Sequence, residues 1–130
     1  MNLPSKELLS EVLDYKVENY SHNGTPITNL AINVDARADN GIRLAKQNIN
    51  IYELAHKCKE WAWRTENVRL ETGRMYGLTT EAHNCRIDVY SGHKFYFNGR
   101  YKDFTANTEP EAIFKACEWI LKQNKGDKNV

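Results

Sequence analysis

The sequence predicts an α+β domain in which an antiparallel sheet of about four to six strands carries its helices on one face. Two segments with apolar residues at helical spacing, 50–64 and 108–121, are the main helices, and a short helix precedes them near the N-terminus. Between them, short segments alternate apolar and polar residues, which is typical of strands. The chain has 130 residues, and we expect one domain over 1–124 with a disordered polar tail at 125–130.

The first predicted element is a short helix that begins after Ser5. Ser5 is a suitable N-cap, because its hydroxyl can accept a hydrogen bond from a free amide of the first turn. Leu8, Leu9, Val12 and Leu13 then lie on one face of the helix. A helix this short is marginal alone, so we expect its apolar face to pack on the rest of the domain.

A hairpin of two strands is predicted next. Residues 15–20 and 27–34 alternate apolar and polar side chains, and the Asn23-Gly24 pair between them supplies the positive φ that a tight turn needs. The following segment, Asp35–Asn48, shows no clear period; Ile42 and Leu44 could end a short strand, and we interpret most of the segment as a long loop. Loops of such length are uncommon in compact domains and tend to be functional or mobile.

The second helix is predicted to begin at Asn50, which serves as its N-cap, with Glu53 in the third helical position. Its buried stripe consists of Ile51, Leu54, Ala55, Cys58, Trp61 and Ala62. Because three of these residues are small, the stripe would let a second backbone approach closely.

Several short strands are predicted between the two main helices. The strand-like segments are 68–70, 75–78, 85–90, 94–97 and 100–104, and glycines separate them. Residues 86–90 and 93–97 flank Ser91-Gly92, which predicts a hairpin, and Asn98-Gly99 makes a second tight turn.

The last helix has the clearest start signal in the sequence. Thr108 and Glu111 form a capping box, and Pro110 stands in the first turn, where its missing N–H costs nothing. The two main helices share the similar runs KCKEWA, at 57–62, and KACEWI, at 115–120. A duplicated unit would explain this likeness, and so would two helices that pack on one sheet.

Composition and charge narrow the possible partners. Eighteen basic and seventeen acidic residues leave a formal net charge of +1, which gives no electrostatic argument for a nucleic-acid or membrane partner. No apolar run approaches the roughly 20 residues that a membrane span needs, and the N-terminus does not read as a signal peptide. Three cysteines without an export signal indicate reduced thiols in the cytoplasm.

The sequence offers no catalytic residue, metal site or cofactor that we can predict. His56 with Cys58, and His83 with Cys85, could be combined into a zinc site, but residues two apart on a helix point in different directions. Cys85 is the single candidate nucleophile, since His83 would share its strand face; an ordinary strand cysteine is the simpler interpretation. A Gly-rich phosphate loop between a strand and a helix is also lacking.

A basic, aromatic strand face is one candidate for nucleic-acid binding, with rings stacking on bases and cations near phosphates. The residues that could form it are Arg69, Arg74, Arg86, Lys94, Arg100, Lys102, Tyr90 and Tyr96. The solvated face of any antiparallel sheet also carries such residues.

From Asn50 onward the order of a helix, three strands and a helix resembles the double-stranded-RNA-binding domain. That family has a basic cluster at the start of its last helix, where this chain has Glu109, Glu111 and Lys115.

A protein-binding surface is the other candidate site. We expect four aromatic residues of the main helices to lie off the central apolar stripes: Tyr52, Trp63, Phe114 and Trp119. Exposed together they would form a protein-binding patch, because Trp and Tyr dominate interface hot spots. Tucked under the edges of the sheet, they would only be core.

Three segments resemble small uncharacterised proteins of bacterial phages and prophages. They are MNLPSKELLSEVL at 1–13, NINIYELAHKCKEWA at 48–62 and TEPEAIFKACEWIL at 108–121. The resemblance carries no known site residue. It implies a non-catalytic protein in the cytoplasm of a bacterial host, monomeric or homodimeric, that binds a host protein or protein–nucleic-acid complex. Anti-CRISPR proteins act in this way, and the neutral charge of this chain favours steric blocking over mimicry of nucleic acid.

Overall fold

A computed structural model describes residues 3–23, 27–38, 41–74, 83–89, 92–94 and 101–128 of the chain. Within these ranges it has three helices and six strands. They are α1 (Lys6–Leu13), β1 (Val17–Asn23), β2 (Asn29–Ala38), β3 (Gly41–Asn50), α2 (Ile51–Glu66), β4 (Arg69–Arg74), β5 (His83–Asp88), β6 (Tyr101–Ala106) and α3 (Glu109–Lys128). The predicted α+β class is confirmed.

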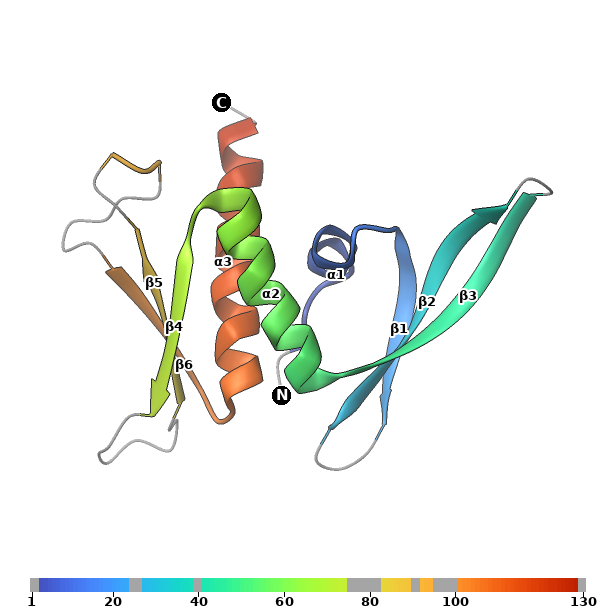
Figure 1. Ribbon diagram of the computed structural model, residues 1–130, viewed down its shortest axis with the longest axis horizontal. Coiled ribbons are helices and arrows are strands. Elements are labelled where there is room, and N and C mark those ends of the chain that lie inside the picture. The colour runs from blue at the N-terminus through green and yellow to red at the C-terminus, as the bar shows by residue number, and fades with distance from the viewer. Residues whose placement is uncertain are drawn as a thin grey trace.

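The strands form two separate antiparallel sheets of three, in the orders β1-β2-β3 and β4-β5-β6. The prediction of one sheet of four to six strands is therefore wrong. The physical reason is α2, which follows β3 directly and carries the chain across the molecule before β4 begins. Figure 1 shows the two sheets at opposite ends of the long axis with the helices between them.

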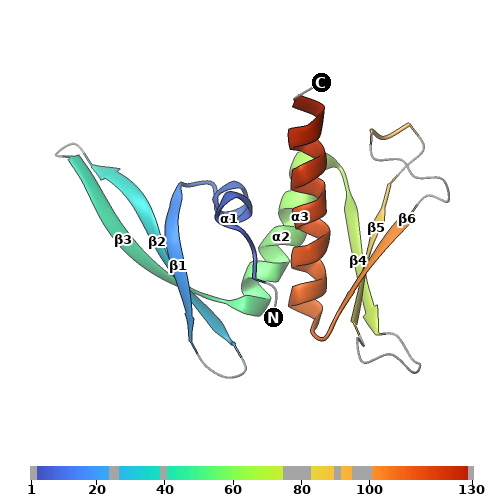
Figure 2. The same ribbon diagram turned by 180° about the vertical axis from the view of Figure 1, so that it is seen from behind.

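The helices form the middle layer of the molecule. Helices α2 and α3 lie side by side and contact the β4-β5-β6 sheet, so the expected cover of one sheet face by the two main helices is found there. Helix α1 packs against β1 and touches both long helices (Figure 2). One continuous cluster of buried apolar side chains, from Leu8 to Leu121, joins all of these elements.

Small residues let α2 and α3 approach closely, as the sequence predicts. Ala55, Cys58 and Ala62 of α2 are buried, and α3 contributes Ala116 and Cys117. The thiol of Cys117 lies 3.7 Å from the backbone carbonyl oxygen of Cys58, to which it donates a weak hydrogen bond. The close contact of the two helices positions their remaining faces, which carry the candidate site residues.

The predicted helix starts are confirmed by their caps. The Ser5 hydroxyl accepts a hydrogen bond from the Leu8 amide at 3.1 Å, and the Asn50 side chain accepts one from the Tyr52 amide at 2.8 Å. Thr108 Oγ1 accepts from the Glu111 amide at 3.3 Å. The last helix is longer than the sequence predicts, because it continues past Leu121 to Lys128, through most of the expected tail.

The Asp35–Asn48 segment is not the loop that the sequence predicts. Strands β2 and β3 pair along their full length, from Asn29 with Asn50 to Ala38 with Gly41. Because β1 pairs with β2 only as far as Val34, the last part of this hairpin has two strands. This outer part reaches away from the helices in Figure 1.

Within the residues that the structure describes, the predicted hairpin between 86–90 and 93–97 is not found. Strand β5 is the centre of its sheet: Arg86 faces Glu71 of β4 on one side and Asp103 of β6 on the other. Since a strand has two edges, none is left for a third partner. Lys94 is outside any strand, and residues 75–78, 90 and 95–97 lie outside the described residues.

The chain passes twice through three antiparallel strands followed by a helix. The two helices of these units, α2 and α3, are those that share the KCKEWA and KACEWI runs. A duplicated unit thus fits the order of elements as well as the sequence likeness.

Candidate functional site

The four aromatic residues proposed for protein binding divide into two exposed and two covered side chains. Tyr52 is 65% exposed and Trp63 is 62% exposed, and both belong to α2. Phe114 is 1% exposed, so its assignment to a surface patch is wrong: it is part of the core. Trp119 is partly buried and packs against Phe104, with ring centroids 6.3 Å apart.

Tyr52 and Trp63 lie on the same side of α2. They are eleven residues apart, which at 100° per residue brings the second within about 20° of the first, about 16 Å further along the axis. His56 and Glu60 stand between them at helical spacing, and the His56 ring contacts the Glu60 carboxylate at 2.8 Å. We call Tyr52, His56, Glu60 and Trp63 the α2 stripe. It joins two exposed rings through a polar pair.

A groove lies beside the Trp63 end of the stripe. Its volume is about 300 Å³. Helix α2 supplies Lys59, Glu60 and Trp63 to its lining, and the chain that leaves the helix supplies Val68, Arg69 and Leu70. A Trp ring that is 62% exposed beside a groove is an unusual surface feature, since Trp is highly buried on average. The stripe and groove together form the candidate protein-binding site.

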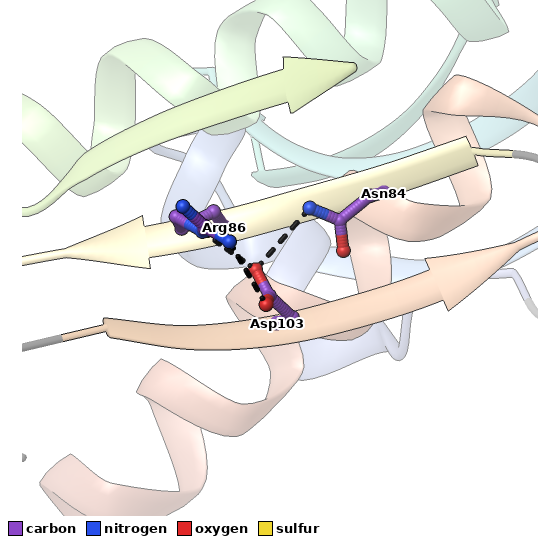
Figure 3. A network of polar contacts seen from close by, with 3 residues as sticks. All are labelled: Asn84, Arg86 and Asp103. Carbon is purple, nitrogen blue, oxygen red and sulfur yellow. Dashed lines mark hydrogen bonds and ion pairs between the residues drawn. The ribbon is translucent and has the colours of Figure 1, made fainter. Parts of the chain in front are cut away.

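The solvent face of the β4-β5-β6 sheet carries a polar network that centres on Asp103 (Figure 3). Arg86 donates from Nε to Asp103 Oδ1 at 2.9 Å and from Nη2 to Oδ2 at 3.3 Å, and Asn84 donates to Oδ1 at 3.2 Å. The hydrogen bonds from Arg86 hold the pKa of Asp103 below its usual value. The Arg86 guanidinium also lies 3.9 Å from the centroid of the Tyr101 ring.

This face has mixed charge, whereas a nucleic-acid site would need a positive excess. Arg69 and Arg86 share it with three acidic residues, since paired residues of adjacent strands project to the same side. Those acids are Glu71, Asp88 and Asp103. Arg69 contacts Glu71 at 3.5 Å. Among the described residues, the basic face expected from the sequence is therefore not found.

The other basic candidates are dispersed. Lys94 contacts Glu66 at 3.2 Å and donates to Asn124 at the end of the helix pair. Lys102 is on the opposite side of β6 from Asp103, with its ammonium 5.7 Å from the centroids of both Phe104 and Trp119. Arg74 is exposed at the end of β4. The remaining candidates lie outside the described residues: Arg100, Tyr90 and Tyr96.

The three thiols are unsuited to nucleophilic chemistry. Cys58, Cys85 and Cys117 are all buried. Burial raises the pKa of Cys85 to about 12, and burial together with the bond to Cys58 raises that of Cys117 well above its ordinary value. A thiol must ionise to attack, so Cys85 is a core residue. Among the described residues, no group of three potential ligands could hold a metal ion.

One part of the candidate site is not evident from the sequence. The groove beside Trp63 forms where α2 meets the start of β4, and no local sequence pattern encodes that contact. The helical spacing of Tyr52 and Trp63 is the one signal that predicts part of the site.

Each helix within the described ranges is too short or too polar to cross a membrane. Comparison of the chain with protein families, with curated proteins and with solved structures finds no match.

Proposed function

We propose that this protein is a non-catalytic binding protein that docks the α2 stripe on another protein. The observation that carries the proposal is the pair Tyr52 and Trp63, which are mostly exposed on one side of one helix while Phe114 is core. Exposed Trp and Tyr rings that flank a polar pair have the composition of interface hot spots. A rigid helix that presents a row of side chains about 16 Å long suits a groove or flat surface of a partner.

A capture experiment with matched variants tests this proposal. Tagged wild-type protein, Tyr52→Ala, Trp63→Ala and Tyr101→Ala are incubated with bacterial lysate, and the stoichiometrically bound protein is quantified. Tyr101 is the control because it is an exposed ring on the β4-β5-β6 sheet, away from α2. We expect the wild-type protein to capture one partner and Trp63→Ala to capture at least tenfold less of it, because loss of a hot spot costs about 2 kcal/mol of binding free energy. Tyr101→Ala should capture as much of that partner as the wild-type protein does. Equal retention by all variants would refute a role for the stripe.

The resemblance to phage and prophage proteins supports a narrower version of the proposal. In it the partner is a host protein or protein–nucleic-acid complex in the bacterial cytoplasm, and the α2 stripe inhibits a defence system by steric blocking, as anti-CRISPR proteins do. The test is phage plaquing on bacteria that carry an active CRISPR system and express the chain. We expect wild-type protein to restore plaques and Trp63→Ala to fail at equal expression. Unchanged immunity would count against this version and leave the binding proposal standing.

Nucleic-acid binding is the second candidate. Its support is the order α2-β4-β5-β6-α3, which has the helix–three-strand–helix topology that the sequence predicts from Asn50 onward. Its weakness is the mixed charge of the described sheet face, where Asp103 already pairs with Arg86. A mobility shift with short double-stranded RNA or DNA decides it. Binding at about 50 mM salt that weakens steeply with added salt would support it, and no shift would exclude it.

A further inference from the structure

Strand β4 has a free edge, and the groove beside Trp63 opens on it. The sheet has the order β4-β5-β6, so among the described strands β4 pairs with β5 alone. The groove is lined by residues of α2 and of the chain at 68–70, and by none of β5 or α3. It therefore lies on the side of β4 that points away from β5. We call this free side of the strand, together with the groove, the β4 edge.

The turn after α2 places the start of β4 against the helix. Asn67 ends α2 with a φ of 54°, and its amide donates to the Trp63 carbonyl at 3.1 Å. The Val68 amide donates to the Ala62 carbonyl, also at 3.1 Å, so the chain reverses at once (Figure 1). Strand β4 then contacts α2, and the helix and the strand form the two sides of the groove.

The backbone of the β4 edge is open to a further strand. Successive residues of a strand direct their N–H and C=O groups to opposite edges, so every second residue of β4 presents these groups away from β5. The strand has no proline, and its pairing from Arg69 to Arg74 shows no bulge. In the part of the chain that the structure describes, no side chain hydrogen-bonds to the β4 backbone. Strand β6, at the other end of the sheet, differs, because Lys115 donates to its Thr105 carbonyl at 2.8 Å.

Gly73 is a second feature of this strand that fits an added backbone. Its φ lies outside the left-handed region, and a Cβ placed there would meet no atom within 4 Å. Neither backbone strain nor packing among the described residues therefore requires a glycine. Glycine weakens the interior of a strand and often marks a place where another backbone approaches closely.

The charges at the β4 edge favour an acidic partner segment. Lys59 lines the groove, and Arg74 is exposed at the far end of β4. Neither belongs to an ion pair within the described ranges. The nearby acidic residues already have basic neighbours: Glu60 contacts the histidine of the α2 stripe at 2.8 Å, and Glu71 contacts Arg69 at 3.5 Å. The surplus charge at the β4 edge is therefore positive.

We propose that the partner adds an extended acidic segment to the β4 edge as a fourth strand of the sheet, with an apolar side chain of this segment in the groove. The inference rests on the proposed function, because Trp63 belongs to the α2 stripe, and it deepens that function by naming the kind of segment that the partner supplies. In strand addition the main-chain hydrogen bonds provide affinity, and a pocket selects the side chain that enters it. The apolar part of the groove lining is Trp63, Val68 and Leu70.

A capped hexapeptide that alternates glutamate and leucine is the probe for this site. It is titrated into isotope-labelled wild-type protein, and the backbone amides are followed by NMR. We expect saturable binding with a Kd below about 1 mM. We also expect slower solvent exchange at every second amide of β4, namely those that exchange fast in the free protein, because a partner backbone covers them.

Backbone N-methylation of the peptide separates strand addition from adsorption of its leucines. One version is methylated at its three leucines and the other at its three glutamates. In an extended peptide all residues of one type direct their N–H groups to the same edge, so only one version turns its methyl groups toward β4. We expect that version to bind at least tenfold more weakly, because it loses two or more hydrogen bonds of about 1 kcal/mol each. The other version should bind as the parent peptide does.

Variants of the protein locate the peptide. Trp63→Ala should weaken its binding by about three- to tenfold, and Tyr52→Ala, at the other end of the α2 stripe, should not change it. Lys59→Glu and the exposed Arg74→Glu should each weaken it by about three- to tenfold. Lys57→Glu makes the same charge change on the exposed side of α2, outside the groove lining, and should have no effect. A peptide that alternates lysine and leucine should bind Lys59→Glu more tightly than wild type.

Four results would overturn strand addition at the β4 edge. They are no peptide binding at about 1 mM, equal affinities of the two methylated peptides, unchanged exchange of the β4 amides at saturation, and protection of these amides that grows with protein concentration in the absence of peptide. The last would show that a second copy of the chain covers the edge. Any of them, combined with a captured partner that Trp63→Ala loses, would leave the proposed function standing. Peptide binding with the expected protection, but no captured partner that depends on Trp63, would instead overturn the proposed function and support the β4 edge as a peptide site.

Discussion

Replacement of Phe114 and Trp63 by alanine tests the division of the aromatic residues into core and surface. Phe114 is 1% exposed, and loss of a fully buried Phe side chain costs about 3–5 kcal/mol once the cavity left behind is included. Trp63 is 62% exposed, so a little over a third of its area is buried. With about 150–250 Å² in such a side chain and about 25 cal/mol per Å², its removal costs about 1.4–2.4 kcal/mol.

Urea denaturation followed by far-ultraviolet circular dichroism measures both free energies of unfolding. We expect Phe114→Ala to cost about 1–3 kcal/mol more than Trp63→Ala, with unchanged slopes. Should Phe114→Ala be unfolded in buffer, Phe114→Leu provides the measurement, at a cost of about 1–1.5 kcal/mol. Equal costs for the two alanine variants, or a cost for Phe114→Ala below about 1 kcal/mol, would refute the assignment of Phe114 to the core.

Four further predictions concern buried or hydrogen-bonded groups. Cys85 and Cys117 should resist an aromatic disulfide reagent at pH 8 in the native state and react fully in denaturant; fast native labelling would contradict their burial. Because their thiol pKa values are raised by folding, the free energy of unfolding should fall as pH rises above about 9, less so in Cys85→Ala. Folding lowers the pKa of Asp103, so its ionised carboxylate contributes fully to the free energy of unfolding above about pH 4. This contribution is lost as pH falls through the folded-state pKa, and Asp103→Asn should therefore lose less stability in acid than the wild-type protein. Identical pH profiles of the two proteins would argue against the Arg86 contact. Asn50→Ala should cost about 1 kcal/mol and Asn50→Asp much less, measured by thermal unfolding; equal costs would mean that the cap contributes little.

The helices could be predicted from the sequence because their signals are local. Ser5, Asn50 and Thr108 are recognisable caps, and each is followed within a few residues by apolar side chains at helical spacing. The hydrogen bonds that fix such starts join groups two or three residues apart. No knowledge of the rest of the fold is needed to find them.

The arrangement of the strands could not be predicted because pairing is not local. Alternation indicates a strand, but it does not say whether β3 pairs with β4 or is separated from it by α2. The outer part of the β2–β3 hairpin, which shows no clear period in the sequence, reaches away from the helices (Figure 1).

The candidate site was predictable in part for the same reason. Helical spacing places Tyr52 and Trp63 on one side of α2, and it can be read from sequence. Whether Phe114 is exposed depends on β6 and on the chain before α1, which lie far away in sequence. The pairing of Arg86 with Asp103 across two strands likewise depends on a register that turns and loops set.

Site-specific photo-crosslinking tests the central claim most directly. A benzophenone side chain is placed at position 56, within the α2 stripe, or at position 101, on the β4-β5-β6 sheet, and the protein is irradiated in bacterial cells. The account predicts one major crosslinked partner from position 56, lost when Trp63 is also replaced by alanine, and no such product from position 101. Equal products from both positions, or a partner seen only from position 101, would contradict it.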